Sequence, residues 1–118
     1  MNKLDQVREF MTESGQTIKE TPTVGRNGQV RFKLMQEENR EYFEAVQDAD
    51  IVEVLDALVD MQYILNGTIL SHGLQHVFDE AYNRVHENNM TKRPFKKNVL
   101  GKVIKPKGFK PVDLSDLI

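Results

Sequence analysis

The sequence predicts an all-α fold, a helical bundle of about four helices followed by an irregular basic C-terminal tail. Apolar residues recur with the 3.6-residue period of amphipathic helices over residues 3–13, 30–46 and 75–89. Residues 51–65 are apolar around nearly the whole helical circumference, which indicates a central helix buried on most sides. Beyond Thr91, prolines and glycines interrupt any long helical pattern.

The first two predicted helices flank a polar loop. The first covers residues 3–13, where the apolar residues at helical spacing are Leu4, Val7, Phe10 and Met11. Residues 14–29 contain three glycines and a proline, a composition typical of an exposed loop. The second helix covers about residues 30–46, and its apolar stripe consists of Phe32, Met35, Tyr42, Phe43 and Val46.

The third predicted helix runs from Ile51 to about Leu70, after a short turn in which Asp50 is the expected N-cap. A Ser-His-Gly sequence follows it, which is a typical C-terminal stop. A fourth helix is expected over about residues 75–89, with an inward side formed by Val77, Phe78, Ala81, Tyr82 and Val85.

The composition narrows the class of protein. With 118 residues and 13.6 kDa the chain has the size of one domain, expected over residues 1–118 with a core at about residues 30–90. The absence of cysteine excludes disulfide scaffolds, thiol nucleophiles and cysteine-based metal sites. No apolar run approaches the ~20 residues of a membrane span, and the charged N-terminus lacks the apolar core of a signal peptide. A cytoplasmic protein is therefore expected.

The net charge of -2 hides an uneven distribution. Residues 1–90 contain 8 Lys and Arg residues and 16 Asp and Glu residues. The tail, residues 91–118, contains 8 Lys and Arg residues and only 2 Asp residues. An acidic body suits metal ions, and a basic tail suits phosphates. The tail is expected to be irregular or to form a short hairpin around residues 99–104.

Three carboxylates interrupt the apolar third helix. Glu53, Asp56 and Asp60 stand at i, i+3 and i+7 and therefore project from one face. That helix holds no Lys or Arg, although a buried carboxylate needs a compensating positive charge. The second helix presents further glutamates on one side, which are Glu37, Glu38, Glu41 and Glu44.

The two acidic faces are expected to meet, because a short turn joins the helices and makes them antiparallel. Facing like charges raise each other's pKa unless a cation lies between them. Oxygen-only ligands favour Mg²⁺, with Mn²⁺ as the alternative. The pattern therefore predicts a divalent metal site, and the competing interpretation is a solvated face of glutamates.

These acidic residues resemble the signature of a known family. The run Glu37-Glu38-x-x-Glu41, followed by Glu53-x-x-Asp56 and Asp60-x-x-Tyr63, is similar to the EExxE…ExxD pattern of the all-α nucleoside triphosphate pyrophosphohydrolases, which include the MazG-type enzymes. Within that superfamily, the sequence most resembles the phosphoribosyl-ATP pyrophosphohydrolase-like branch. Three further features carry this resemblance, which are Gly67, Asn89-Met90-Thr91-Lys92 and Gly101-Lys102-Val103-x-Lys105. The resemblance spans about residues 30–113.

The resemblance implies a Mg²⁺-dependent enzyme that hydrolyses an NTP, a dNTP or a related nucleotide to the monophosphate and pyrophosphate. It implies that the metal ligands are Glu38, Glu41, Asp56 and Asp60, and that the catalytic carboxylates are Glu37 and Glu53. Two ligand pairs on the third helix stay open, Asp56 with Asp60 or Glu53 with Asp56, because Ala57 stands where the signature has a glutamate. The predicted substrate-binding residues are Asn89, Lys92, Lys102 and Lys105.

Two further predictions concern partners. One small chain cannot cover a helix that is apolar all round, so a homodimer or homotetramer is expected. The alternative function is a small helical interaction module whose basic tail, at Lys92, Arg93, Lys96 and Lys97, contacts nucleic acid. The acidic body and the pI of about 5.9 argue against a nucleic-acid partner, and no membrane partner is expected.

Overall fold

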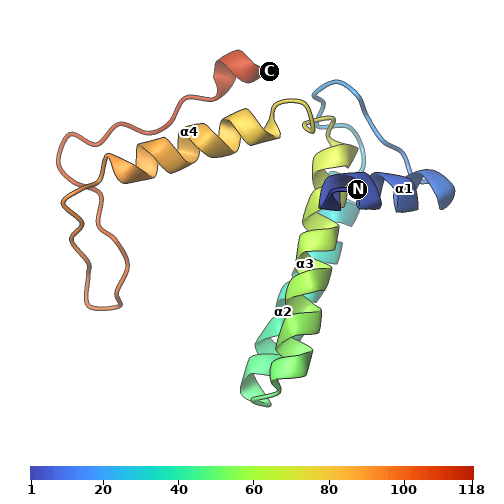
Figure 1. Cartoon of the computed structure of the whole chain (residues 1–118), viewed down its shortest axis with the longest axis horizontal. Coiled ribbons are helices and arrows are strands. Elements are labelled where there is room, and N and C mark those ends of the chain that lie inside the picture. The colour runs from blue at the N-terminus through green and yellow to red at the C-terminus, as the bar shows by residue number, and fades with distance from the viewer. The chain divides into compact units, whose positions relative to one another are not determined.

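The structure, a computed structural model, describes residues 1–118 and is all-α (Figure 1). This confirms the predicted fold class, because helices account for 58% of the residues and no strand is present. None of the helices combines the length and the apolar character that a membrane span requires. The elements are α1 (Lys3–Glu13), α2 (Gly28–Gln47), α3 (Ile51–Ser71), α4 (Phe78–Met90) and a short 3₁₀ helix, η1 (Ser115–Leu117).

The chain divides into two compact units, residues 1–75 and residues 76–118. The first unit holds α1, α2 and α3, and the second holds α4 and η1. The single domain over residues 1–118 stays a prediction.

Helix α1 packs against the C-terminal half of α3 and forms the small apolar core of the first unit. Val7 and Met11, one turn apart on α1, are each 2% exposed, and they pack with the fully buried Leu70 of α3. Phe10 meets Tyr63 of α3 edge-on, with ring centroids 5.7 Å apart. The side chain of Asn2 accepts a hydrogen bond from the backbone N–H of Asp5 (2.8 Å) and so caps the start of α1.

Helices α2 and α3 form an antiparallel hairpin, and they lie side by side along their lengths (Figure 1). The turn between them is short, and Asp50 caps α3 as expected, since its Oδ1 accepts from the N–H groups of Val52 (3.1 Å) and Glu53 (3.2 Å). Ala49 completes the turn at a φ of 51°. This turn brings the acidic part of α2 to the acidic part of α3.

Within one chain the predicted apolar stripes are largely exposed, and their burial by a partner subunit stays a prediction. The buried residues of α2 are Arg31 and Ala45, whereas Phe32 and Phe43 of the predicted stripe are each 58% exposed. The central helix is likewise not buried on most sides, because its exposed apolar residues include Ile51, Val52, Leu55, Leu58 and Val59. The physical reason is that a two-helix hairpin covers only one flank of each helix.

The second unit differs from expectation at the start of its helix. Helix α4 begins at Phe78 rather than near Gln75, because Gln75 belongs to the preceding loop, where its side-chain amide donates to the carbonyl of Lys19 (2.6 Å). No residue of α4 is fully buried, so the inward side predicted for it is incomplete in one chain. Arg84 holds the chain end to α4 through two hydrogen bonds to Asp116 (2.6 and 2.9 Å).

The tail is mostly irregular, as expected, and contains one hairpin-like turn. An isolated antiparallel bridge joins Lys97 to Val103. The backbone N–H of Ile104 donates to the carbonyl of Lys96 (2.7 Å), and that of Asn98 donates to the carbonyl of Lys102 (2.9 Å). The turn therefore lies close to the predicted residues 99–104 but does not extend into a pair of strands.

Candidate metal centre

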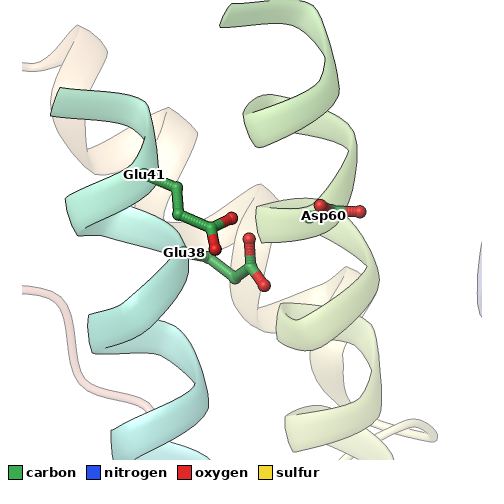
Figure 2. Close-up of side chains that lie close together, drawn as sticks. All are labelled: Glu38, Glu41 and Asp60. Carbon is green, nitrogen blue, oxygen red and sulfur yellow. The ribbon is translucent and has the colours of Figure 1, made fainter. Parts of the chain in front are cut away.

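Three carboxylates meet at the middle of the α2–α3 hairpin. Glu38, Glu41 and Asp60 each offer one oxygen, and these oxygens all lie within 4.8 Å of one another. Figure 2 shows the two glutamates projecting from α2 on the side of α3, from which Asp60 comes. Glu38 and Asp60 are half-buried and Glu41 is exposed. The arrangement is an oxygen-only cluster with one side open to solvent.

Local geometry explains why these residues come together. Glu38 and Glu41 are three residues apart on α2, so both lie on one side of the helix. The antiparallel course of α3 then brings Asp60 opposite Glu38, one turn beyond the buried Ala57. The small side chains of Ala57 on α3 and Ala45 on α2, both buried, allow the two helix backbones to approach closely.

The electrostatics of the cluster favour a bound cation. Burial raises the pKa of Glu38 to about 7, and the hydrogen bond and negative charge of Glu41 add to the rise. Burial also raises the pKa of Asp60, with further contributions from Asp56 and Glu41. The Oε2 atom of Glu38 is buried without a hydrogen-bond partner. An orphaned acceptor among crowded carboxylates fits a hard divalent cation.

The other predicted acidic residues lie around this cluster. Glu37 is exposed, and its negative charge helps to raise the pKa of Glu38. Asp56 lies close enough to Asp60 to raise its pKa as well. A neighbouring cavity of about 160 Å³ is lined by Glu41, Glu44, Ala45, Asp48, Glu53, Asp56 and Ala57. On α3, Asp60 belongs to the cluster, whereas Glu53 and Asp56 both line this cavity, so the choice between the two ligand pairs stays open.

The predicted substrate-binding residues all belong to the second unit. Lys92 donates to the side chain of Asn89 (3.1 Å) and lies over the ring of Phe109, 5.2 Å from its centroid. Lys102 and Lys105 are exposed on and beyond the hairpin-like turn. Other basic residues instead surround a cavity of about 460 Å³, which is lined by Asn88, Thr91, Arg93, Pro106, Lys107, Gly108, Phe109 and Lys110.

Sequence reasoning missed one residue of the hairpin, Arg31. It is only 6% exposed and packs against Gly67 of α3. The available signal was its position seven residues before Glu38, which places both on the same face of α2. Nothing in the local sequence marked this arginine as buried, because its surroundings are supplied by α3.

The raised pKa of Glu38 predicts how the metal-free protein responds to pH. A carboxyl whose pKa rises from 4.5 to about 7 on folding stabilises the fold fully below pH 4.5, and this contribution is lost as the pH rises to 7. We expect the melting temperature in EDTA to fall by roughly 5 °C between pH 5 and pH 8. The Glu38→Gln variant should show a much weaker fall. An equal fall in both proteins would contradict the shifted pKa.

Comparison with known proteins identifies the family. The model of the phosphoribosyl-ATP pyrophosphohydrolase family matches residues 5–89, which include the acidic cluster and most of α1 and α4. No curated protein matches the chain. The family lies in the MazG-like all-α NTP pyrophosphohydrolase superfamily, so the predicted resemblance is confirmed. Its members are hydrolases that act on phosphoric anhydrides of nucleotides and are typically metal-dependent. The chain, matched over most of its length and carrying this cluster in its α2–α3 hairpin, belongs to the phosphoribosyl-ATP pyrophosphohydrolase family.

Proposed function

We propose that the protein is a Mg²⁺-dependent nucleoside triphosphate pyrophosphohydrolase, which converts an NTP, a dNTP or a related nucleotide to the monophosphate and pyrophosphate. The observation that carries this proposal is the cluster of Glu38, Glu41 and Asp60, in which one buried carboxylate oxygen lacks a partner. Carboxylates crowded in this way cost free energy unless a cation compensates them. Mn²⁺ is the alternative ion.

The acidic residues divide into proposed ligands and proposed proton acceptors. Glu38, Glu41 and Asp60 would hold the ion, with Asp56 as a further ligand beside Asp60. When bound, Mg²⁺ would neutralise triphosphate charge and lower the pKa of the attacking water. The oxygen of that water would bond to the phosphorus that carries the leaving pyrophosphate, and the anhydride bond between them would break.

The proton of the attacking water must pass to a carboxylate that is not tied up as a ligand. Glu37 is the proposed acceptor, because it is exposed and adjacent in sequence to Glu38. Glu53 at the neighbouring cavity is the second candidate. Asn89, Lys92, Lys102 and Lys105 remain the proposed substrate-binding residues, since cationic donors stabilise departing phosphates.

The decisive experiment measures pyrophosphate release from a panel of NTPs, dNTPs and phosphoribosyl-ATP, with Mg²⁺, with Mn²⁺ and with EDTA. We expect release from at least one nucleotide with either metal and none with EDTA. A parallel melting experiment should show stabilisation by Mg²⁺, because a ligand that binds only the folded state raises its melting temperature. Metal-independent turnover, or release from no nucleotide in the panel, would contradict the proposal.

We also propose that the protein is a homodimer or a homotetramer. The support is the apolar surface left exposed on α2 and α3. It includes a groove of about 630 Å³ lined by Phe32, Met35, Gln36, Asn39, Leu58, Met61, Gln62 and Leu65. An exposed apolar surface of this kind is typical of an interface. The cytoplasmic location stays a prediction.

A further inference from the structure

Arg31 is a buried cation without an anionic partner. Its side chain lies between α2 and α3, and the structure contains no ion pair to it. Instead, its Nε donates to the hydroxyl of Thr68 (3.1 Å) and its Nη2 donates to the backbone carbonyl of Ile64 (2.9 Å). Burial lowers the pKa of the guanidinium. Because an unpaired buried charge is costly, such a residue needs a reason in the structure around it.

Gly67 makes the position of Arg31 possible. A Cβ atom at residue 67 would overlap Nη2 of Arg31 and would lie 3.2 Å from its Cζ. The guanidinium therefore rests against the bare backbone of α3, between Ile64 and Thr68. The hydroxyl of Thr68 in turn donates to the carbonyl of Ile64 (2.8 Å), which holds it as the acceptor for Arg31.

A single axial register of α2 against α3 produces two pairings. It brings Arg31 to Gly67, and it brings Glu38 to Asp60. Glu38 follows Arg31 by seven residues on α2, and Gly67 follows Asp60 by seven residues on α3. Seven residues are about two helical turns, or roughly 10 Å, so both pairs lie on the same faces of the hairpin. In antiparallel helices, the register that seats the guanidinium on Gly67 therefore also places Glu38 opposite Asp60.

The acidic cluster by itself works against this register. Glu38, Glu41 and Asp60 repel one another, and a slip of α3 by one turn would move Asp60 by about 5 Å and relieve the repulsion. Apolar contacts between the helices resist such a slip weakly, because they are not directional. Hydrogen bonds from a planar guanidinium are directional and resist it well.

We propose that Arg31 is a positioning residue for the metal centre, because its guanidinium, bound to Ile64 and Thr68 against Gly67, sets the register of α2 on α3 that brings the three carboxylates together. The inference rests on the proposed function, because the metal centre itself is part of that proposal. It adds a residue that helps to form the centre from a position two helical turns away. Arg31 acts through the helices and does not itself touch the cluster or the reacting atoms.

The register can be measured without metal. The chain has no cysteine, so spin labels attach only at introduced ones, and the exposed Lys33 on α2 and Val52 on α3 suit them. Pulsed EPR on Lys33→Cys/Val52→Cys protein, diluted with unlabelled chains, should give one narrow distance. Adding Arg31→Met should broaden the distribution or shift it by about one helical turn, roughly 5 Å. An unchanged distribution in folded Arg31→Met protein would overturn the proposal.

Metal affinity provides a second readout that does not depend on turnover. We expect Arg31→Met to weaken Mg²⁺ binding about tenfold in a titration followed by melting temperature, as is common when a residue that orients ligands is lost. Thr68→Val removes only one acceptor and should weaken binding less, so it tests the proposal even if Arg31→Met fails to fold. Thr12→Val, at an exposed position of α1, is the matched control and should change nothing.

A repacked variant separates positioning from simple packing. In Arg31→Met/Gly67→Ala, apolar atoms fill the space of the guanidinium, which should recover much of the melting temperature. Mg²⁺ affinity and the EPR distance should remain altered, and their full recovery would overturn the proposal. If unaltered protein binds no Mg²⁺, the proposed metal function fails, while the EPR distances still decide whether Arg31 sets the register.

Discussion

Replacing Glu38 by glutamine is expected to lower pyrophosphate release by roughly a thousandfold while leaving the protein folded. The variant removes one negative charge from the cluster, and with it a ligand that would hold the ion and stabilise charge in the transition state. The metal-free protein should melt at a higher temperature at pH 8, because the cost of burying the Glu38 charge disappears, together with its repulsion by Glu41 and Asp60. Opposite changes in activity and stability distinguish a functional carboxylate from a structural one.

The measurements are kcat/KM with the best nucleotide of the panel and melting temperature in EDTA. Glu9→Gln, at an exposed position of α1, is the matched control and should leave both unchanged. Asp60→Asn should behave like Glu38→Gln, and comparing it with Asp56→Asn and Glu53→Gln will identify the ligand pair on α3. Near-normal turnover in Glu38→Gln and Asp60→Asn would refute the proposed metal centre.

Replacing Val59 by lysine is expected to convert the oligomer to monomers at micromolar concentration. Val59 is 55% exposed in one chain and belongs to the apolar surface of α3 that also includes Leu55 and Leu58. A charge buried at the centre of such an interface commonly weakens association by a hundredfold or more, since its desolvation is not compensated. Sedimentation velocity with unaltered protein should show a dimer or tetramer of the 13.6 kDa chain.

Thr12→Lys, which adds the same charge at an exposed position of α1, is the control and should keep the oligomer. A monomeric unaltered protein, or a Val59→Lys protein that remains fully associated, would contradict the proposed interface. Turnover of the monomeric variant would further show whether the metal centre acts within a single chain.

Much of the fold could be predicted from the sequence because it depends on neighbours along the chain. Apolar periodicity predicts the bounds of α1 and the extent of α3. The cap at Asp50 follows from its side chain, which lies next to two backbone N–H groups that have no partner within the helix. Burial was predicted less well. Apolar residues such as Phe32 and Phe43 belong to surfaces that are expected to be buried. Periodicity does not say whether the same chain or a second chain buries them.

The sequence by itself determined that two helices, joined by a short turn, carry carboxylates on faces able to meet, since helical spacing alone puts them there. Only the tertiary structure decided which carboxylates come together. It brings Asp60 to Glu38 and Glu41, leaves Glu53 at a neighbouring cavity and buries Arg31 against Gly67. The physical reason is that pairing across helices depends on their axial register and rotation, which are set by contacts between residues distant in the sequence.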